Sequence, residues 1–213
     1  MIKRFGLSWP TLYKFSEYEL LGTELNADHI NSTVECWPAL VEHAYAKFCE
    51  SYDILTNGFE DPLQFISDLV PDKIEKLPEE ILKDHRSFIS FVRNSEREVL
   101  DATVLFLARL KKSKNKIVGF HQYTSIHIFK PRAESEQPAV MVRNPWGNYE
   151  PNTGILSDKK LKKGKQALPK RYRYIIDEIE QYGLQNHFDD GVFIKTIPEL
   201  FSSYDELVGI KIK

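Results

Sequence analysis

Cysteine, long apolar runs and a net charge of one sign are all scarce in this sequence of 213 residues. Cys36 and Cys49 are its only cysteines, and they lie 49 − 36 = 13 positions apart in one predicted helix. That separation is too long for a disulfide along a helix, so a secreted module built on disulfides is excluded. No stretch is apolar enough to span a bilayer, and Gly6 and Pro10 interrupt the region after the basic start. We expect a soluble, cytoplasmic protein, with delivery into another cell as an open alternative.

The charges nearly cancel, because 29 Lys and Arg face 31 Asp and Glu. No global field therefore attracts nucleic acid or an anionic membrane, and neither is predicted as a partner. Locally, residues 159–173 hold eight Lys or Arg in fifteen positions. This segment is interpreted either as a solvated loop or as a docking patch for an acidic partner.

Hydrophobic periodicity predicts a helical part followed by a sheet. Apolar residues at helical spacing indicate helices from about residue 35, over 61–69, from 77 to about 92, and near 172–179. β-Branched and aromatic residues predict strands over 103–110, 117–129, 139–142, 191–195 and 207–212, with a short helix begun by Ile197 and Pro198. The predicted class is α+β, with an antiparallel, barrel-like sheet and helices flanking it on one side.

A histidine and an asparagine occupy neighbouring predicted strands. His121 lies inside one strand and Asn144 at the end of the next, and the separation of 144 − 121 = 23 positions suits a strand, a loop and a return strand. The amide oxygen can then accept the imidazole N–H and set its tautomer, which is the orienting half of a Cys-His-Asn triad. The alternative is a packed polar histidine. We expect Asn144 to be exposed, so that its replacement by alanine leaves folding intact.

Five segments, in the correct order, resemble the second half of the calpain-family cysteine protease core. Residues 37–58, beginning Trp-Pro-Ala-Leu-Val-Glu-His-Ala-Tyr, resemble the helix that opens this half. His-Gln-Tyr-Thr at 121–124 is similar to the family's His-Ala-Tyr-Ser, and residues 143–147 reproduce its Arg-Asn-Pro-Trp-Gly. Gly-Ile-Leu-Ser-Asp at 154–158 resembles Gly-Ala-Trp-Ser-Asp, and residues 189–193 with 207–210 resemble the closing segment. The resemblance implies a calpain-like domain over 35–213, preceded by an arm or strand over 1–34.

By this resemblance His121 is the general base, Asn144 its orienting partner, and Trp146 a shield against water. Shielding matters because water competes for the hydrogen bonds that orient the imidazole. The sequence departs from the family pattern at Phe120 and Gln122, where the family has small residues beside the histidine, and at Leu156, where it has a tryptophan.

The family's nucleophilic cysteine belongs to a separate preceding half, for which these residues have no room. Without a thiolate no acyl-enzyme forms. Cys36 is followed by Trp37, as the family's nucleophile is, and a helix start lowers a thiol pKa. Its surroundings, however, resemble the second-half helix, which favours a buried structural thiol. Two hypotheses follow: a binding or regulatory module that is inactive alone, or a cysteine endopeptidase that uses Cys36 or a cysteine from a partner chain.

The resemblance also implies a calcium site. Glu150, Asp158 and Asp190 match three positions at which calpain second halves bind Ca²⁺, and oxygen ligands on loops suit this ion. One family ligand is lost, because Val192 stands where the family has a glutamate. The alternative is three solvated carboxylates. No other cofactor is predicted, and the expected partner is a protein or peptide.

Overall fold

The computed structural model describes residues 73–109, 111–113, 117–119, 121–144, 151, 154–184 and 191–213. The predicted arm over 1–34 and the helices predicted from 35 and over 61–69 lie outside these residues. Within the described part, no helix is both long and apolar enough to cross a membrane.

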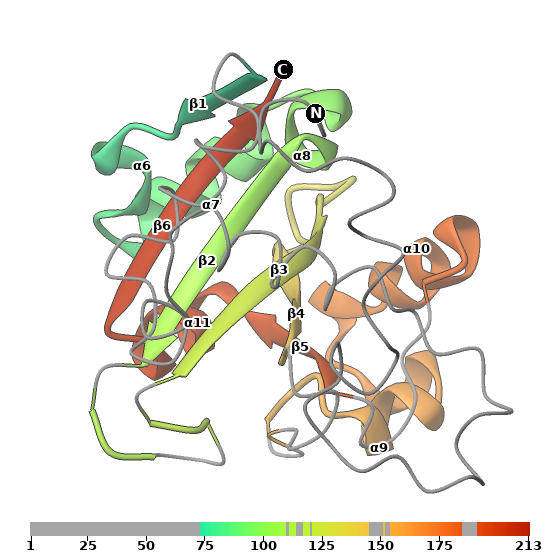
Figure 1. Ribbon diagram of the computed structural model, residues 1–213. Coiled ribbons are helices and arrows are strands. Elements are labelled where there is room, and N and C mark those ends of the chain that lie inside the picture. The colour runs from blue at the N-terminus through green and yellow to red at the C-terminus, as the bar shows by residue number, and fades with distance from the viewer. Residues whose placement is uncertain are drawn as a thin grey trace, which may run out of the picture. The chain divides into compact units, whose positions relative to one another are not determined.

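Six strands form one antiparallel sheet in the order β1-β6-β2-β3-β4-β5 (Figure 1). The strands are β1 (Ile74–Lys76), β2 (Thr103–Arg109), β3 (His121–Phe129), β4 (Ala139–Arg143), β5 (Val192–Thr196) and β6 (Glu206–Ile212). The antiparallel α+β class is confirmed, and β1 is the one described strand that the sequence pattern did not predict. The barrel expectation is wrong, since β1 and β5 end the strand order without pairing to each other. With only three residues, β1 is too short to close a barrel.

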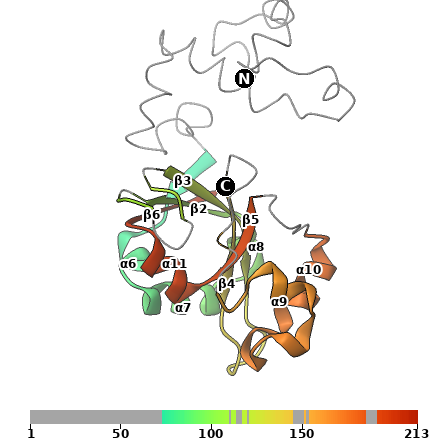
Figure 2. The same cartoon turned by 90° about the horizontal axis from the view of Figure 1, so that it is seen from below.

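Helices cover both faces of the sheet rather than one. The described helices are α6 (Glu79–Leu82), α7 (His85–Asn94), α8 (Arg97–Asp101), α9 (Asp158–Lys162), α10 (Tyr174–Tyr182) and α11 (Ile197–Ser203), with short 3₁₀ helices η4 (Lys165–Ala167) and η5 (Lys170–Tyr172). In Figure 2, α6, α7 and α11 lie on one side of β4 and β5, and α9 and α10 lie on the other. The expectation of helices on one side is therefore wrong. The physical reason is that β4 and β5 carry consecutive rather than alternating apolar residues, and both of their faces are buried.

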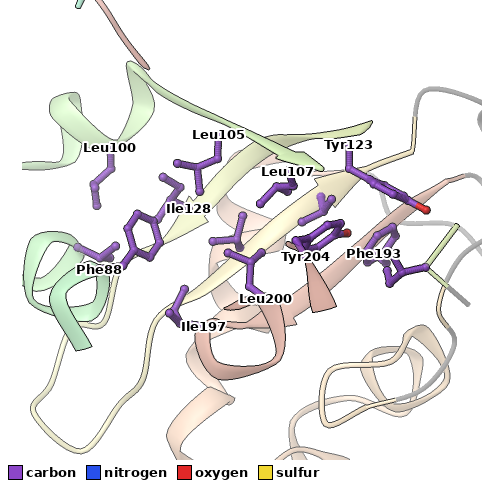
Figure 3. Close-up of a cluster of buried hydrophobic side chains, with 14 residues drawn as sticks. Phe88, Leu100, Leu105, Leu107, Tyr123, Ile128, Phe193, Ile197, Leu200 and Tyr204 are labelled. Atoms are coloured by element: carbon purple, nitrogen blue, oxygen red, sulfur yellow. The ribbon is translucent and has the colours of Figure 1, made fainter. Parts of the chain in front are cut away.

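The two faces hold two separate hydrophobic clusters. The first lies between the sheet and α7, α8 and α11 (Figure 3). Its buried members are Phe88, Val92, Leu100, Leu105, Leu107, Ile117, Tyr123, Ile128, Val140, Val142, Phe193, Ile197, Leu200 and Tyr204. The second lies under α9 and α10 and includes Phe129, Met141, Leu161, Leu168, Tyr172, Ile175 and Ile194.

Local capping signals decide where the helices begin. The predicted helix over 77–92 is divided, because Asp84 is extended and its carboxylate accepts hydrogen bonds from the Arg86 and Ser87 amides. This is N-cap geometry, and it starts α7 afresh after α6. At the predicted Ile197 start, Thr196 and Glu199 form a reciprocal capping box that begins α11.

A β-bulge interrupts β3 between Ser125 and His127. An extra residue in one strand reverses which face the following side chains occupy. Tyr123 accordingly packs in the first cluster, whereas Phe129 packs in the second. Ile126 lies in the bulge and is one of the few exposed large hydrophobic residues in the described part.

A buried charge cluster joins α8, β3 and α10. Arg97 donates to Glu178 at 2.8 Å, to the Ile128 carbonyl at 2.9 Å, and to Asp101. His127 Nε2 lies 2.8 Å from the same Glu178 oxygen, Oε1. Because Glu178 is 2% exposed, this cluster ties α10 to the sheet through charge-assisted hydrogen bonds. The sequence patterns did not predict it.

Candidate active site

His121 is the first residue of β3, and its backbone pairs with Arg109 of β2. The imidazole is half-buried and lies edge-to-face against the ring of Tyr123, with the ring centroids 4.9 Å apart. The two side chains share a face because residues i and i+2 of a strand point the same way. Strand geometry thus places the histidine over an aromatic support.

Asn144 directly follows β4 and is fully buried, at 0% exposure. Its backbone N–H donates to the Gly191 carbonyl at 2.7 Å, just before β5 begins. The expectation that Asn144 is exposed is therefore wrong. The cause is its position: the Asn144 backbone is hydrogen-bonded to Gly191 just before β5, and its side chain faces His121 rather than solvent.

The two side chains meet as the sequence predicts. His121 Nε2 and Asn144 Oδ1 are 2.8 Å apart. An amide oxygen can only accept, so Nε2 carries the proton and donates it. In this neutral tautomer Nδ1 holds the lone pair and is the basic nitrogen of the ring. The buried amide thereby selects which nitrogen can take up a proton.

Tyr123 supports this pair from the first hydrophobic cluster. It is 1% exposed, and its ring lies edge-to-face with Tyr204 at 5.3 Å and with Phe193 at 6.0 Å. Its hydroxyl accepts the Val118 N–H at 2.8 Å, which fixes the segment leading into β3. Burial raises the pKa of Tyr123, so the hydroxyl stays protonated at neutral pH. No role was predicted for Tyr123 within the His-Gln-Tyr-Thr motif; its position two residues after the histidine was the available signal.

Gly119 is a second supporting residue that the sequence patterns did not predict. A Cβ at this position would lie 2.7 Å from the Ser113 amide nitrogen and closer still to the Lys111 carbonyl oxygen, both backbone atoms. Its N–H donates to Ser113 Oγ at 2.9 Å. Glycine is required here for close backbone approach rather than for an unusual φ. Phe120 stands where the family has a glycine, but Gly119 directly precedes it and allows the close approach to the backbone of Lys111 and Ser113.

The remaining predicted site residues divide into two groups. Trp146, Cys36, Glu150 and Asp190 lie outside the described residues. Asp158 is 8% exposed and opens α9 after Ser157. In the described part of the chain, no group of three or more His, Cys, Asp or Glu side chains could hold a metal ion. The calcium site stays a prediction.

An α+β domain that holds a strand histidine against an asparagine oxygen carries the base-orienting part of a Cys-His-Asn arrangement. The family model described as calpain family cysteine protease matches residues 20–208. The chain therefore belongs to the calpain family of cysteine proteases. The match begins earlier than the resemblance read from the motifs, at residue 20 rather than about 35. Among curated proteins, no significant match is found.

Proposed function

We propose that this calpain-family chain supplies the base and the orienting amide of a Cys-His-Asn triad, and that alone it acts as a binding or regulatory module. The observation that carries the proposal is the hydrogen bond from His121 Nε2–H to Asn144 Oδ1, at 2.8 Å. We assign this role to a domain over residues 35–213 that corresponds to the second half of a calpain core, with residues 1–34 as an arm.

The geometry suits a general base that works on a thiol. With Nε2–H held by Asn144, Nδ1 can take the thiol proton, and the resulting imidazolium stays hydrogen-bonded to the amide oxygen. Because Asn144 is fully buried, water competes little for this bond. Trp146 would complete the shield by the family resemblance.

The proposed lack of autonomous activity rests on the cysteines. The sequence holds only Cys36 and Cys49, and the segment after Cys36 resembles a second-half helix rather than a nucleophile segment. A triad without a thiolate forms no acyl-enzyme, so the oriented histidine alone cleaves no peptide bond. The surface around His121 then serves a protein or peptide partner, including a nucleophile-bearing half supplied by another chain.

The second candidate function is cysteine endopeptidase activity, with Cys36 or a partner chain's cysteine as nucleophile. The same observation favours it, because the imidazole already has the tautomer and the support that a catalytic base needs. The two candidates differ only in whether a thiol reaches Nδ1.

Thiol labelling distinguishes them. The full chain is treated with a biotinylated peptidyl epoxide, and casein cleavage is followed with and without calcium. The proposal expects neither labelling nor cleavage. The matched variants are Cys36→Ser, Cys49→Ser and His121→Ala. Labelling that is lost in both Cys36→Ser and His121→Ala, but kept in Cys49→Ser, overturns the proposal in favour of the endopeptidase.

Reconstitution tests the partner. The chain is mixed with a separately expressed, cysteine-bearing half of a calpain-family core, and binding and casein cleavage are measured together. Binding without cleavage supports a binding or regulatory module. Cleavage that is lost on His121→Ala shows instead that the missing thiol is supplied in trans. No binding at all contradicts both versions of the partnership.

A further inference from the structure

The strongest unassigned feature is the basic segment, residues 159–173, on the face of the sheet opposite to Tyr123. The structure folds this segment into α9, η4 and η5, so the solvated-loop interpretation is wrong in its secondary structure. All eight of its Lys and Arg residues are exposed: Lys159, Lys160, Lys162, Lys163, Lys165, Lys170, Arg171 and Arg173. A strongly charged surface is therefore displayed on ordered turns.

Apolar anchors hold the basic segment in place. Leu161, Leu168 and Tyr172 are buried in the second hydrophobic cluster beneath it. Anchors at these intervals leave the intervening Lys and Arg side chains exposed to solvent. In Figure 2, α9 of this segment lies on the same side as α10, away from α6, α7 and α11. The charges are thus held on a rigid support, at a lower entropic cost of binding than on a flexible tail.

Few of these cations are neutralised by the protein. Lys165 pairs with Asp177, the one ion pair that the segment makes to a carboxylate among the described residues. Lys160 donates to the Gly154 carbonyl, and Arg173 to the Leu168 carbonyl. Arg171 lies over the Tyr172 ring at 5.3 Å. Uncompensated positive charge of this density in a chain with a net charge of -2 indicates an external anionic ligand.

We propose that the basic segment docks an acidic segment of a polypeptide partner. Two features of the surface favour a carboxylate-rich chain over other polyanions. Its aromatic residue, Tyr172, is buried, so the segment offers no exposed ring for stacking bases. None of the exposed large hydrophobic residues in the described part belongs to it, so it has no apolar side chain to insert into a bilayer.

This inference is independent of the proposed protease role. His121 is supported by Tyr123 in the first hydrophobic cluster, whereas the basic segment is anchored in the second. Variants of the segment therefore leave the His121 to Asn144 hydrogen bond in place. Failure of either proposal leaves the other standing.

The test is fluorescence anisotropy of a labelled oligoglutamate peptide with the full chain. We expect binding that weakens as ionic strength rises from about 50 to 200 mM, because exposed charges are screened over this range. The variant Lys162→Gln/Lys163→Gln/Lys170→Gln should bind about tenfold more weakly. An oligothymidylate of equal charge and phosphatidylserine vesicles serve as alternative ligands.

The matched control is Lys73→Gln/Lys83→Gln/Lys112→Gln, which removes the same charge from exposed lysines elsewhere. It should change affinity by about twofold at most, since distant exposed charges are screened. Coincident thermal melts for the two triple variants show that both fold. Equal losses in the two variants, no peptide binding at low salt, or tighter binding to the oligothymidylate or the vesicles would each overturn the proposal.

Discussion

His121 and His127 belong to the same strand but lie on opposite faces of the sheet. The bulge between Ser125 and His127 reverses the alternation, so that His121 packs against Tyr123 and His127 packs against Phe129. Without the bulge, two odd-numbered histidines of one strand would share a face. One imidazole is thereby placed at the candidate active site, and the other in the charge cluster under α10.

Asn144→Ala should lower the free energy of unfolding by about 1–3 kcal/mol, because it removes a fully buried acceptor of the imidazole N–H. Urea denaturation measures the change. Asn94→Ala is the matched control: this exposed residue makes one weak bond, to Ser90, and its loss should cost about 0.5 kcal/mol or less. Equal costs at the two positions would contradict a structural role for the Asn144 amide.

Tyr123→Phe removes the hydroxyl that accepts the Val118 N–H but keeps the ring. We expect a loss of about 1 kcal/mol in unfolding free energy and an unchanged His121 tautomer. Tyr123→Leu also removes the aromatic contacts to His121, Phe193 and Tyr204, and should cost about 2–4 kcal/mol. Nitrogen-15 chemical shifts of the imidazole report the tautomer. A tautomer change in Tyr123→Phe would show that the hydroxyl, and not the ring, orients His121.

Glu178→Ala should destabilise the fold by about 3–5 kcal/mol, because it strips Arg97 and His127 of a buried carboxylate. The double variant Arg97→Met/Glu178→Met should recover much of this loss, since it leaves no uncompensated charge from the pair. Chemical denaturation of Arg97→Met, Glu178→Met and the double variant closes a double-mutant cycle. Strictly additive costs would show that the two side chains do not depend on each other.

High pH should unfold the protein through its buried tyrosines. Burial raises the pKa values of Tyr123, Tyr174 and Tyr204 above that of an unfolded tyrosine, which is about 10. A pKa raised in the folded state gives stability that is fully present below pH of about 10 and is lost as the pH rises above it. Absorbance at the tyrosinate band and circular dichroism, followed together, test this. Ionisation of all the tyrosines without loss of structure would contradict the burial.

The sequence was a good guide wherever one local signal dominated. β-Branched and aromatic residues located β2 to β6, and Ile197 with Pro198 marked the start of α11. The contact between His121 and Asn144 was also predictable, because antiparallel pairing brings the ends of neighbouring strands together.

Other features depended on tertiary packing. Consecutive apolar residues in β4 and β5 indicate cover on both faces, whereas Asn144 was expected to be exposed and the helices to lie on one side. The bulge in β3 carries no glycine signal, and the Arg97 cluster joins residues far apart in the chain. The edge strand β1 has three residues, too few for a period to be read.

The backbone N–H of Asn144 donates to the Gly191 carbonyl, and this hydrogen bond joins the two ends of the long connection between β4 and β5, which carries α9 and α10. The entropy of closing such a loop grows only slowly with its length. Changes in the length of its exposed connections should therefore cost little, and the asparagine side chain keeps its place beside the imidazole.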